Sequence, residues 1–118
     1  MNLAPIVLFV YNRPWHTKQT VEALQKNELA KESELFIYCD EAKNEDAGKS
    51  VDEVREYIDK VDGFKKVTII KREKNWGLAD SIIDGVTKIV NEYGKIIVLE
   101  DDMVTSPYFL KFMNEALE

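Results

Sequence analysis

Four short apolar runs divide the chain, and helical patterns lie between them. The runs are rich in β-branched and aromatic residues and lack strict polar alternation, which is typical of strands buried on both faces of a parallel sheet. They cover residues 6–11, 35–39, 67–70 and 96–99 and start roughly 30 residues apart, the spacing of βαβ units. The pattern therefore predicts an α/β fold, an open and mostly parallel sheet of about four strands with helices on both faces.

The first two helices of this pattern lie before and after the second strand. The first is expected to begin at Pro14, a residue tolerated in a first helical turn, and to run to about Lys26. Residues 40–49 are predicted to form a charged loop. The second helix is predicted to begin at Ser50, because Glu53 completes a capping box three residues later.

The last two helices have recognisable end signals. The third is expected to end at Gly94, and Asn75 is its candidate N-cap. For the fourth, Ser106 is the candidate N-cap and Pro107 the first helical residue. Its expected inward stripe consists of Phe109, Phe112, Met113 and Leu117.

Length and composition limit the class of protein. A chain of 118 residues with 45% hydrophobic residues is long enough for one domain with its own core. The net charge of −6 argues against nucleic acid as a partner, because such proteins concentrate positive charge. The single cysteine, Cys39, excludes an intrachain disulfide and is expected to be a buried, inert thiol. The first apolar run follows no basic segment and is too short to span a bilayer, so we expect a cytoplasmic protein that reaches the inner face of a membrane only through regions outside these residues.

Polar residues follow each predicted strand. Because ligands bind beyond the carboxyl ends of the strands in such sheets, these residues are the candidate site. They are Tyr11, Asn12 and Arg13 after the first strand, Asp40 after the second, Arg72 after the third, and Glu100, Asp101 and Asp102 after the fourth.

The acidic triplet is the most informative of these segments. Adjacent carboxylates repel each other, and a hard cation such as Mg²⁺ or Mn²⁺ neutralises them. Such an ion is commonly held by one or two carboxylates together with substrate phosphates. The alternative is that the acidic residues only terminate the strand or cap the helix after Ser106.

Each of the other candidates has a functional and a structural interpretation. Arg13 and Arg72 have the geometry to bind one diphosphate. Asp40 is either a ligand for a ribose or a base N–H, or the acceptor of an Asx turn. Tyr11 either stacks on a base or is the last aromatic residue of the core. His16, the only histidine, has no partner for a metal pair and is expected on the surface.

Several enzyme classes lack their motifs here. The chain contains no G-x-S-x-G nucleophile elbow, no P-loop and no G-x-G-x-x-G segment. Triad hydrolases, P-loop ATPases and standard dinucleotide-binding enzymes are therefore not supported.

Four segments together resemble a known family. PIVLFVYNRP, FIYCD, KNWGLADSI and VLEDDMVTSPYFLKFM are similar to segments of nucleotide-sugar glycosyltransferases with the GT-A fold, especially family 2. The last contains an E-D-D form of the D-x-D motif, similar to that of N-acetylglucosaminyltransferase I. The resemblance covers the whole chain.

The resemblance implies a site and a reaction. Tyr11, Asn12, Arg13, Asp40, Arg72, Glu100 and Asp101 would bind the nucleotide-sugar, and Asp102, with Asp101, would bind Mn²⁺ or Mg²⁺. The donor would be a UDP-sugar and the acceptor a hydroxyl of a glycan or another molecule, with inversion at the anomeric carbon. Residues 1–118 would be a single nucleotide-sugar-binding domain, the N-terminal part of a longer glycosyltransferase that supplies the general base elsewhere.

Two other functions stay open on the sequence. A sugar-phosphate nucleotidyltransferase would need a glycine-rich phosphate loop where this chain has Tyr11–Pro14. A non-catalytic α/β module would bind Mg²⁺ through the triplet without a nucleotide.

Overall fold

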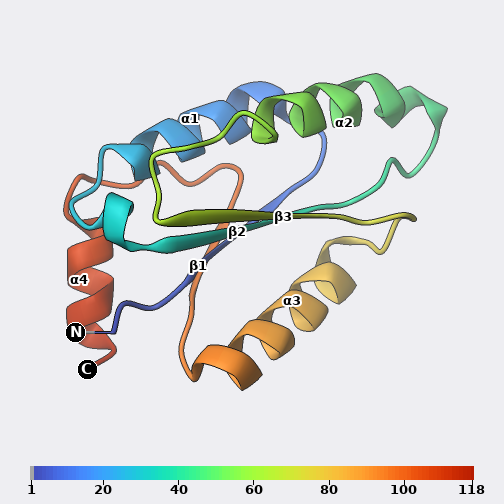
Figure 1. The fold of residues 1–118 in the computed structure, drawn as a ribbon. Helices are drawn as coiled ribbons and strands as arrows, with labels where there is room; N and C mark the ends of the chain where they lie inside the picture. Colours follow the sequence, from blue (N-terminus) through green and yellow to red (C-terminus); the bar gives the residue numbers. More distant parts are fainter. Residues whose placement is uncertain (1) are drawn as a thin grey trace.

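The computed structural model describes residues 2–118 and contains a four-stranded sheet with helices on both faces (Figure 1). The strands are β1 (Ile6–Val10), β2 (Glu34–Cys39), β3 (Lys66–Lys71) and β4 (Ile97–Glu100). The helices are α1 (Pro14–Gln25), α2 (Glu45–Ile58), α3 (Leu78–Tyr93) and α4 (Phe109–Ala116), with a short 3₁₀ turn, η1 (Ala30–Glu32). The predicted α/β class and the number of strands are confirmed.

All strand pairs in the sheet are parallel, and the spatial order is β3-β2-β1-β4. β1 lies between β2 and β4, with Leu8 opposite both Ile37 and Leu99. The chain moves outward from β1 to β3 and then returns through α3 to the other side of β1. This reversal creates a topological switch point between β1 and β4. Sheets of this kind bind ligands at the switch point, beyond the carboxyl ends of the strands.

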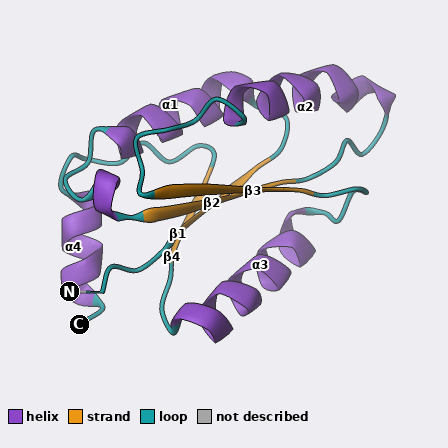
Figure 2. Ribbon diagram, viewed as in Figure 1, coloured by secondary structure: helices purple, strands orange, loops and turns teal. Residues whose placement is uncertain are grey.

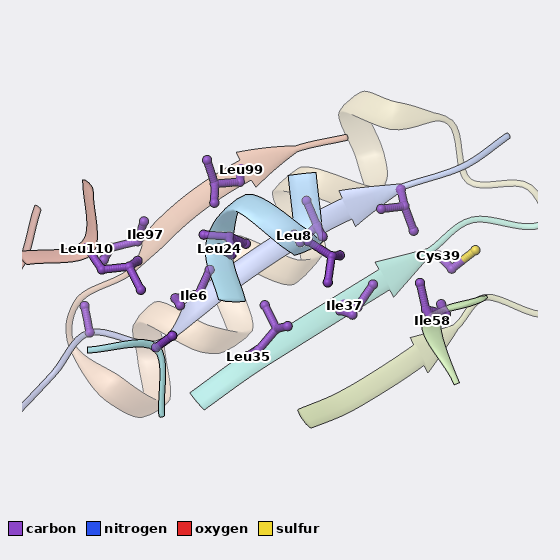
Figure 3. Close-up of a cluster of buried hydrophobic side chains, with 14 of the residues drawn as sticks. Ile6, Leu8, Leu24, Leu35, Ile37, Cys39, Ile58, Ile97, Leu99 and Leu110 are labelled. Carbon is purple, nitrogen blue, oxygen red and sulfur yellow. The ribbon is translucent and has the colours of Figure 1, made fainter. Parts of the chain in front are cut away.

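The helices divide the core into two layers. α1 and α2 cover one face of the sheet and α3 covers the other (Figure 2). The first layer contains Leu8, Ile37 and Leu99 from the strands, packed against Leu24 and Ile58 from the helices (Figure 3). The second contains Val7, Phe9, Phe36, Tyr38 and Ile89. Because every residue of β1 is buried, the central strand has the two-sided apolar pattern that the sequence indicated.

The predicted start of the second helix is wrong. α2 begins at Glu45, not Ser50, and Asn44 is its N-cap, with its Oδ1 accepting a hydrogen bond from Ala47 N at 3.1 Å. Glu45 and Asp46 in the first turn suit the positive end of the helix dipole. An earlier cap with favourable charges therefore extends the helix into the segment predicted as a loop.

The ends of α3 agree with the prediction at one terminus only. Gly94 is the C-cap in the left-handed conformation, at φ 80°, as expected. The N-cap is Gly77 rather than Asn75, whose side chain instead donates to Asp40 and to the Glu41 carbonyl oxygen.

The expected start of the last helix is wrong, and its expected inward stripe is confirmed only for Phe109 and Met113. α4 begins at Phe109 after the N-cap Tyr108, and Phe112 is 67% exposed. The buried positions are Leu110 and Asn114. Asn114 faces inward because its Oδ1 accepts a hydrogen bond from Ala4 N at 2.7 Å, next to the start of β1. Phe109 and Met113 pack against the first core layer from its margin.

The helices between residues 2 and 118 are all too short or too polar to cross a lipid bilayer.

Candidate functional site

A pocket of about 460 Å³ lies at the carboxyl edge of the sheet. Its walls come from the end of β1 and residues 11–13, from residues 100–102 after β4, and from residues after β2 and before α3. The site is therefore at the switch point between β1 and β4, where the topology predicts a ligand. Of the eight residues predicted for the site, seven line this pocket: Tyr11, Asn12, Arg13, Asp40, Glu100, Asp101 and Asp102.

The acidic triplet forms one wall of the pocket. Glu100 is the last residue of β4, and Asp101 and Asp102 form the turn that follows. The turn is anchored from α1, because Thr20 Oγ1 donates a hydrogen bond of 2.9 Å to the Asp101 carbonyl oxygen. The pairing of β1 with β4 thus brings the triplet beside the residues that follow β1.

Arg13 faces this wall as the N-cap of α1. Its Nη2 lies 4.0 Å from Asp102 Oδ2, and both side chains are about half exposed. An ion pair this open contributes little to folding, because water screens it. The pair instead places a guanidinium next to an accessible carboxylate, so that the pocket presents both signs of charge to a ligand.

Asp101 has a raised pKa. Partial burial is the largest cause, and the negative charges of Asp102 and Glu100 add to it. Arg13 and His16 act in the opposite direction without cancelling the effect. A carboxylate whose charged form is disfavoured by burial and by neighbouring negative charges is stabilised more by a bound cation than an exposed carboxylate is.

The described residues 2–118 contain no group of three His, Cys, Asp or Glu side chains that converge as a complete metal site. The oxygen donors of Asp101 and Asp102 nevertheless suit a hard cation. Mg²⁺ commonly binds one or two carboxylates and fills the remaining positions with water and substrate phosphates. The residues present fit that kind of shared site.

Tyr11 and Asn12 form the pocket wall next to β1. The Tyr11 hydroxyl accepts a hydrogen bond of 2.8 Å from Lys43 N, which ties the loop after β2 to the end of β1. Tyr11 is half-buried and Asn12 is exposed. The ring of Tyr11 is therefore fixed at one end and lines the pocket.

Asp40 also lines the pocket, but its carboxylate already has protein partners. The side chain is 6% exposed. Its Oδ1 accepts from Glu41 N at 2.9 Å and from Trp76 N at 2.8 Å. Its Oδ2 accepts from Gly77 N at 2.9 Å and from Asn75 Nδ2 at 3.2 Å.

Arg72 is the one predicted site residue that does not line the pocket. It is 6% exposed, and its guanidinium lies 4.8 Å from the ring centroid of Tyr38 and 4.1 Å from that of Trp76. Nη1 donates to Asp84 Oδ2 at 2.8 Å, and Nη2 donates to the Ser81 carbonyl oxygen at 3.2 Å. Arg72 follows the end of β3, as the sequence predicted, but its side chain contacts other protein residues and does not face the pocket.

The sequence analysis did not assign the other seven pocket residues to the site, and it named one of them, Asn75, only as a candidate N-cap. These residues are Phe9, Val10, Lys43, Asn75, Gly77, Leu78 and Ser81. Lys43 lies in a run of charged residues, where nothing distinguishes it from Lys49. Leu78 and Ser81 belong to the first turn of α3, and the candidate N-cap signal nearby was the available clue to that turn.

An open parallel sheet with a polar pocket at its switch point is typical of Rossmann-like α/β ligand-binding proteins. A family model described as "Glycosyl transferase family 2" matches residues 6–118. The chain therefore belongs to glycosyl transferase family 2. The family implies a nucleotide-sugar donor and an acceptor in general. No curated protein matches the chain.

Proposed function

We propose that this chain is the donor-binding part of a metal-dependent glycosyltransferase that uses a nucleoside diphosphate sugar, with UDP as the nucleotide. The sugar would pass to a hydroxyl acceptor with inversion at the anomeric carbon. One observation supports the proposal most strongly: Arg13 and Asp102 form an ion pair within the pocket at the switch point of a family 2 domain.

The diphosphate is the part of the donor that this arrangement suits best. Arg13 presents planar N–H donors that match phosphate oxygens. Asp102, with Asp101, would hold Mn²⁺ or Mg²⁺, and a phosphate-bound cation needs no further carboxylate cage. When bound, the cation would supply Lewis-acid stabilisation of the nucleoside diphosphate as leaving group.

The other pocket residues would position the nucleoside. Tyr11 offers an aromatic face to the base, and its hydroxyl bond to Lys43 N keeps the ring in place. Asn12 and Glu100 offer polar groups to the ribose and phosphates along the same wall.

Calorimetric titration of UDP, CDP, GDP and dTDP, with and without Mn²⁺, tests this proposal. We expect UDP to bind with Mn²⁺ and to bind much more weakly without it. Asp102→Asn is expected to reduce the metal-dependent affinity by on the order of tenfold or more, because it removes a direct ligand. Asp52→Asn, at an exposed position of α2, is the charge-matched control and should leave the affinity unchanged. Binding of Mn²⁺ alone with no effect on any nucleotide would overturn the proposal in favour of a simple metal-binding module.

A further inference from the structure

Helix α1 connects the two charged groups of the pocket. Its N-cap, Arg13, provides the guanidinium that lies 4.0 Å from Asp102. Thr20 follows seven residues later on the same helix, about 10 Å further along the axis. The hydroxyl of this buried side chain donates a hydrogen bond of 2.9 Å to the Asp101 carbonyl oxygen. One helix therefore holds the guanidinium and also contacts the backbone of the acidic turn.

The acidic turn has little other support. β4 is an edge strand of four residues and pairs only with β1. Among the described residues 2–118, Thr20 provides the one hydrogen bond that joins Asp101 or Asp102 to another part of the chain. The turn's own bond, from Met103 N to the Glu100 carbonyl oxygen, is longer, at 3.3 Å. The Thr20 hydroxyl is therefore the contact that fixes where the two aspartates lie.

The chain beyond the turn is fixed to α1 separately. It runs back beside the helix to α4 (Figure 1). Asn27, just after the end of α1, is 6% exposed, and its Nδ2 donates to Thr105 Oγ1 at 3.0 Å. Its Oδ1 accepts a hydrogen bond of 2.9 Å from Leu110 N. Because these bonds do not involve Thr20, loss of the Thr20 hydroxyl should free the turn without releasing the rest of the segment.

We infer that Thr20 is a positioning residue of the metal site, whose hydroxyl sets the place of Asp101 and Asp102 relative to Arg13. Thr20 is buried and does not line the pocket, so it does not contact a ligand. It acts through the backbone of a metal-binding residue, in the way that hydrogen-bond partners of metal ligands commonly orient them. The link to the metal rests on the proposed function, whereas the fixing of the turn stands on the contacts alone.

Thr17 provides a matched control on the same helix. Like Thr20 it is fully buried, but its Oγ1 has no hydrogen-bond partner among residues 2–118. A change to valine at either position replaces a hydroxyl with a methyl group of similar size, and only at Thr20 is a bond to the acidic turn lost. Thr20→Ser is a second control, because it keeps the hydroxyl and removes only the methyl group.

The first experiment measures the turn without any ligand, by amide hydrogen exchange at Met103, whose N–H closes the turn. Thr20→Val should speed this exchange by about fivefold or more, because the turn loses its hydrogen bond to α1. Thr20→Ala, which removes the hydroxyl without adding a methyl group in its place, should give the same result. Thr17→Val and Thr20→Ser lose no such bond and should stay within about twofold of the unsubstituted chain.

Slow exchange at buried Leu8 of β1 identifies the variants that are folded. Unchanged exchange at Met103 in folded Thr20→Val or Thr20→Ala would overturn the inference.

The second experiment measures, by calorimetry, the gain in UDP affinity that Mn²⁺ produces. We expect Thr20→Val to reduce this gain by on the order of tenfold, since displaced carboxylates no longer meet the cation and the phosphates together. Thr17→Val and Thr20→Ser should leave the gain nearly unchanged. UDP affinity without Mn²⁺ should also stay nearly unchanged in Thr20→Val, because the bond that holds Tyr11 is independent of Thr20.

Three results of this second experiment would overturn the inference. One is an unchanged gain in folded Thr20→Val. Another is a loss in Thr20→Ser as large as that in Thr20→Val, because packing of the methyl group would then be responsible. The third is an equal loss of UDP affinity with and without Mn²⁺, which would show a general effect on the pocket. If the unsubstituted chain does not bind UDP at all, the proposed function fails, and the exchange at Met103 decides the fixing of the turn independently.

Discussion

Gly85 of α3 packs directly against the ring of Phe9 of β1. A β-carbon at residue 85 would lie 2.9 Å from Phe9 Cζ and 3.2 Å from Tyr38 Cε2. The close approach lets α3 pack onto the strand whose end forms the floor of the pocket. We predict that Gly85→Ala lowers the free energy of unfolding by about 1–3 kcal/mol, because two rings and a helix must move to admit the methyl group.

Urea unfolding measures this effect, and Gly48→Ala is the matched control. Gly48 lies in α2, and a β-carbon there would meet nothing within 4 Å. Alanine favours a helix by up to about 1 kcal/mol over glycine, so the control should be neutral or slightly stabilising. Equal effects of the two substitutions would contradict the packing argument.

The ion pair between buried Arg72 and partly exposed Asp84 predicts an acid-dependent loss of stability. Burial alone would raise the pKa of Asp84, but hydrogen bonds and positive charge from Arg72 and Lys88 outweigh it and hold the pKa below its ordinary value. A carboxylate with a lowered pKa stabilises the fold above its unfolded-state pKa, and that contribution is lost as the pH falls through the folded-state pKa. The difference in unfolding free energy between the unsubstituted chain and Asp84→Asn should therefore be largest near pH 7 and shrink below about pH 4. Asp52→Asn serves as the exposed control, and a difference that does not vary with pH would argue against the pair.

Asp101 predicts a pH dependence of metal binding that sets in at a higher pH than the loss of stability at Asp84. Burial and its acidic neighbours raise the pKa of Asp101, so the carboxyl stays protonated to a higher pH than an ordinary aspartate. Because a metal ligand must be deprotonated, Mn²⁺-dependent UDP affinity should fall as the pH is lowered from 7 toward 5. His16 is the neighbouring imidazole whose charge acts on Asp101, and His16→Gln controls for it. Persistence of the pH response in His16→Gln and its reduction in Asp101→Asn are the expected results. Loss of the response in His16→Gln would assign it to the histidine.

Tyr11 offers a test that separates the aromatic ring from its hydroxyl. Tyr11→Phe keeps the ring but removes the acceptor of the 2.8 Å bond from Lys43 N, whereas Tyr11→Ala removes both. If the ring stacks on the base, Tyr11→Ala should weaken UDP by about 1–3 kcal/mol more than Tyr11→Phe does, as measured by calorimetry. Equal losses would mean that Tyr11 acts only through the loop it holds.

The strands were predictable because buried strands have a recognisable local sequence pattern. Each strand is an apolar run of β-branched and aromatic residues, and the ends of the parallel strands define one binding edge. Helix starts were less predictable, since Ser50 and Asn44 both have capping side chains. The choice depended on the two acidic residues that follow Asn44 in the first turn.

The pocket was predictable to the level of its segments but not to the role of each side chain. Strand ends placed Arg13 beside Asp102 and Asp40 at the same edge. The partners of Asp40 and Arg72 were not predictable, because they lie about 35 residues and 12 residues away in sequence and meet only when α3 packs on the sheet. A local sequence pattern does not indicate contacts between residues that are far apart in the sequence.

Paramagnetic broadening of backbone amide signals by Mn²⁺ in the presence of UDP tests the central claim directly, with Mg²⁺ as the diamagnetic reference. The described structure offers an internal comparison, a second pocket of about 690 Å³ at the amino edge of the sheet, lined in part by Glu32, Glu34 and Glu92. We predict that UDP and Mn²⁺ together broaden the signals of residues 11–13 and 100–103 most strongly and leave those around Glu34 and Glu92 sharp. Broadening centred on the amino-edge pocket, or spread evenly over the acidic surface, would contradict a donor site at the junction of β1 and β4.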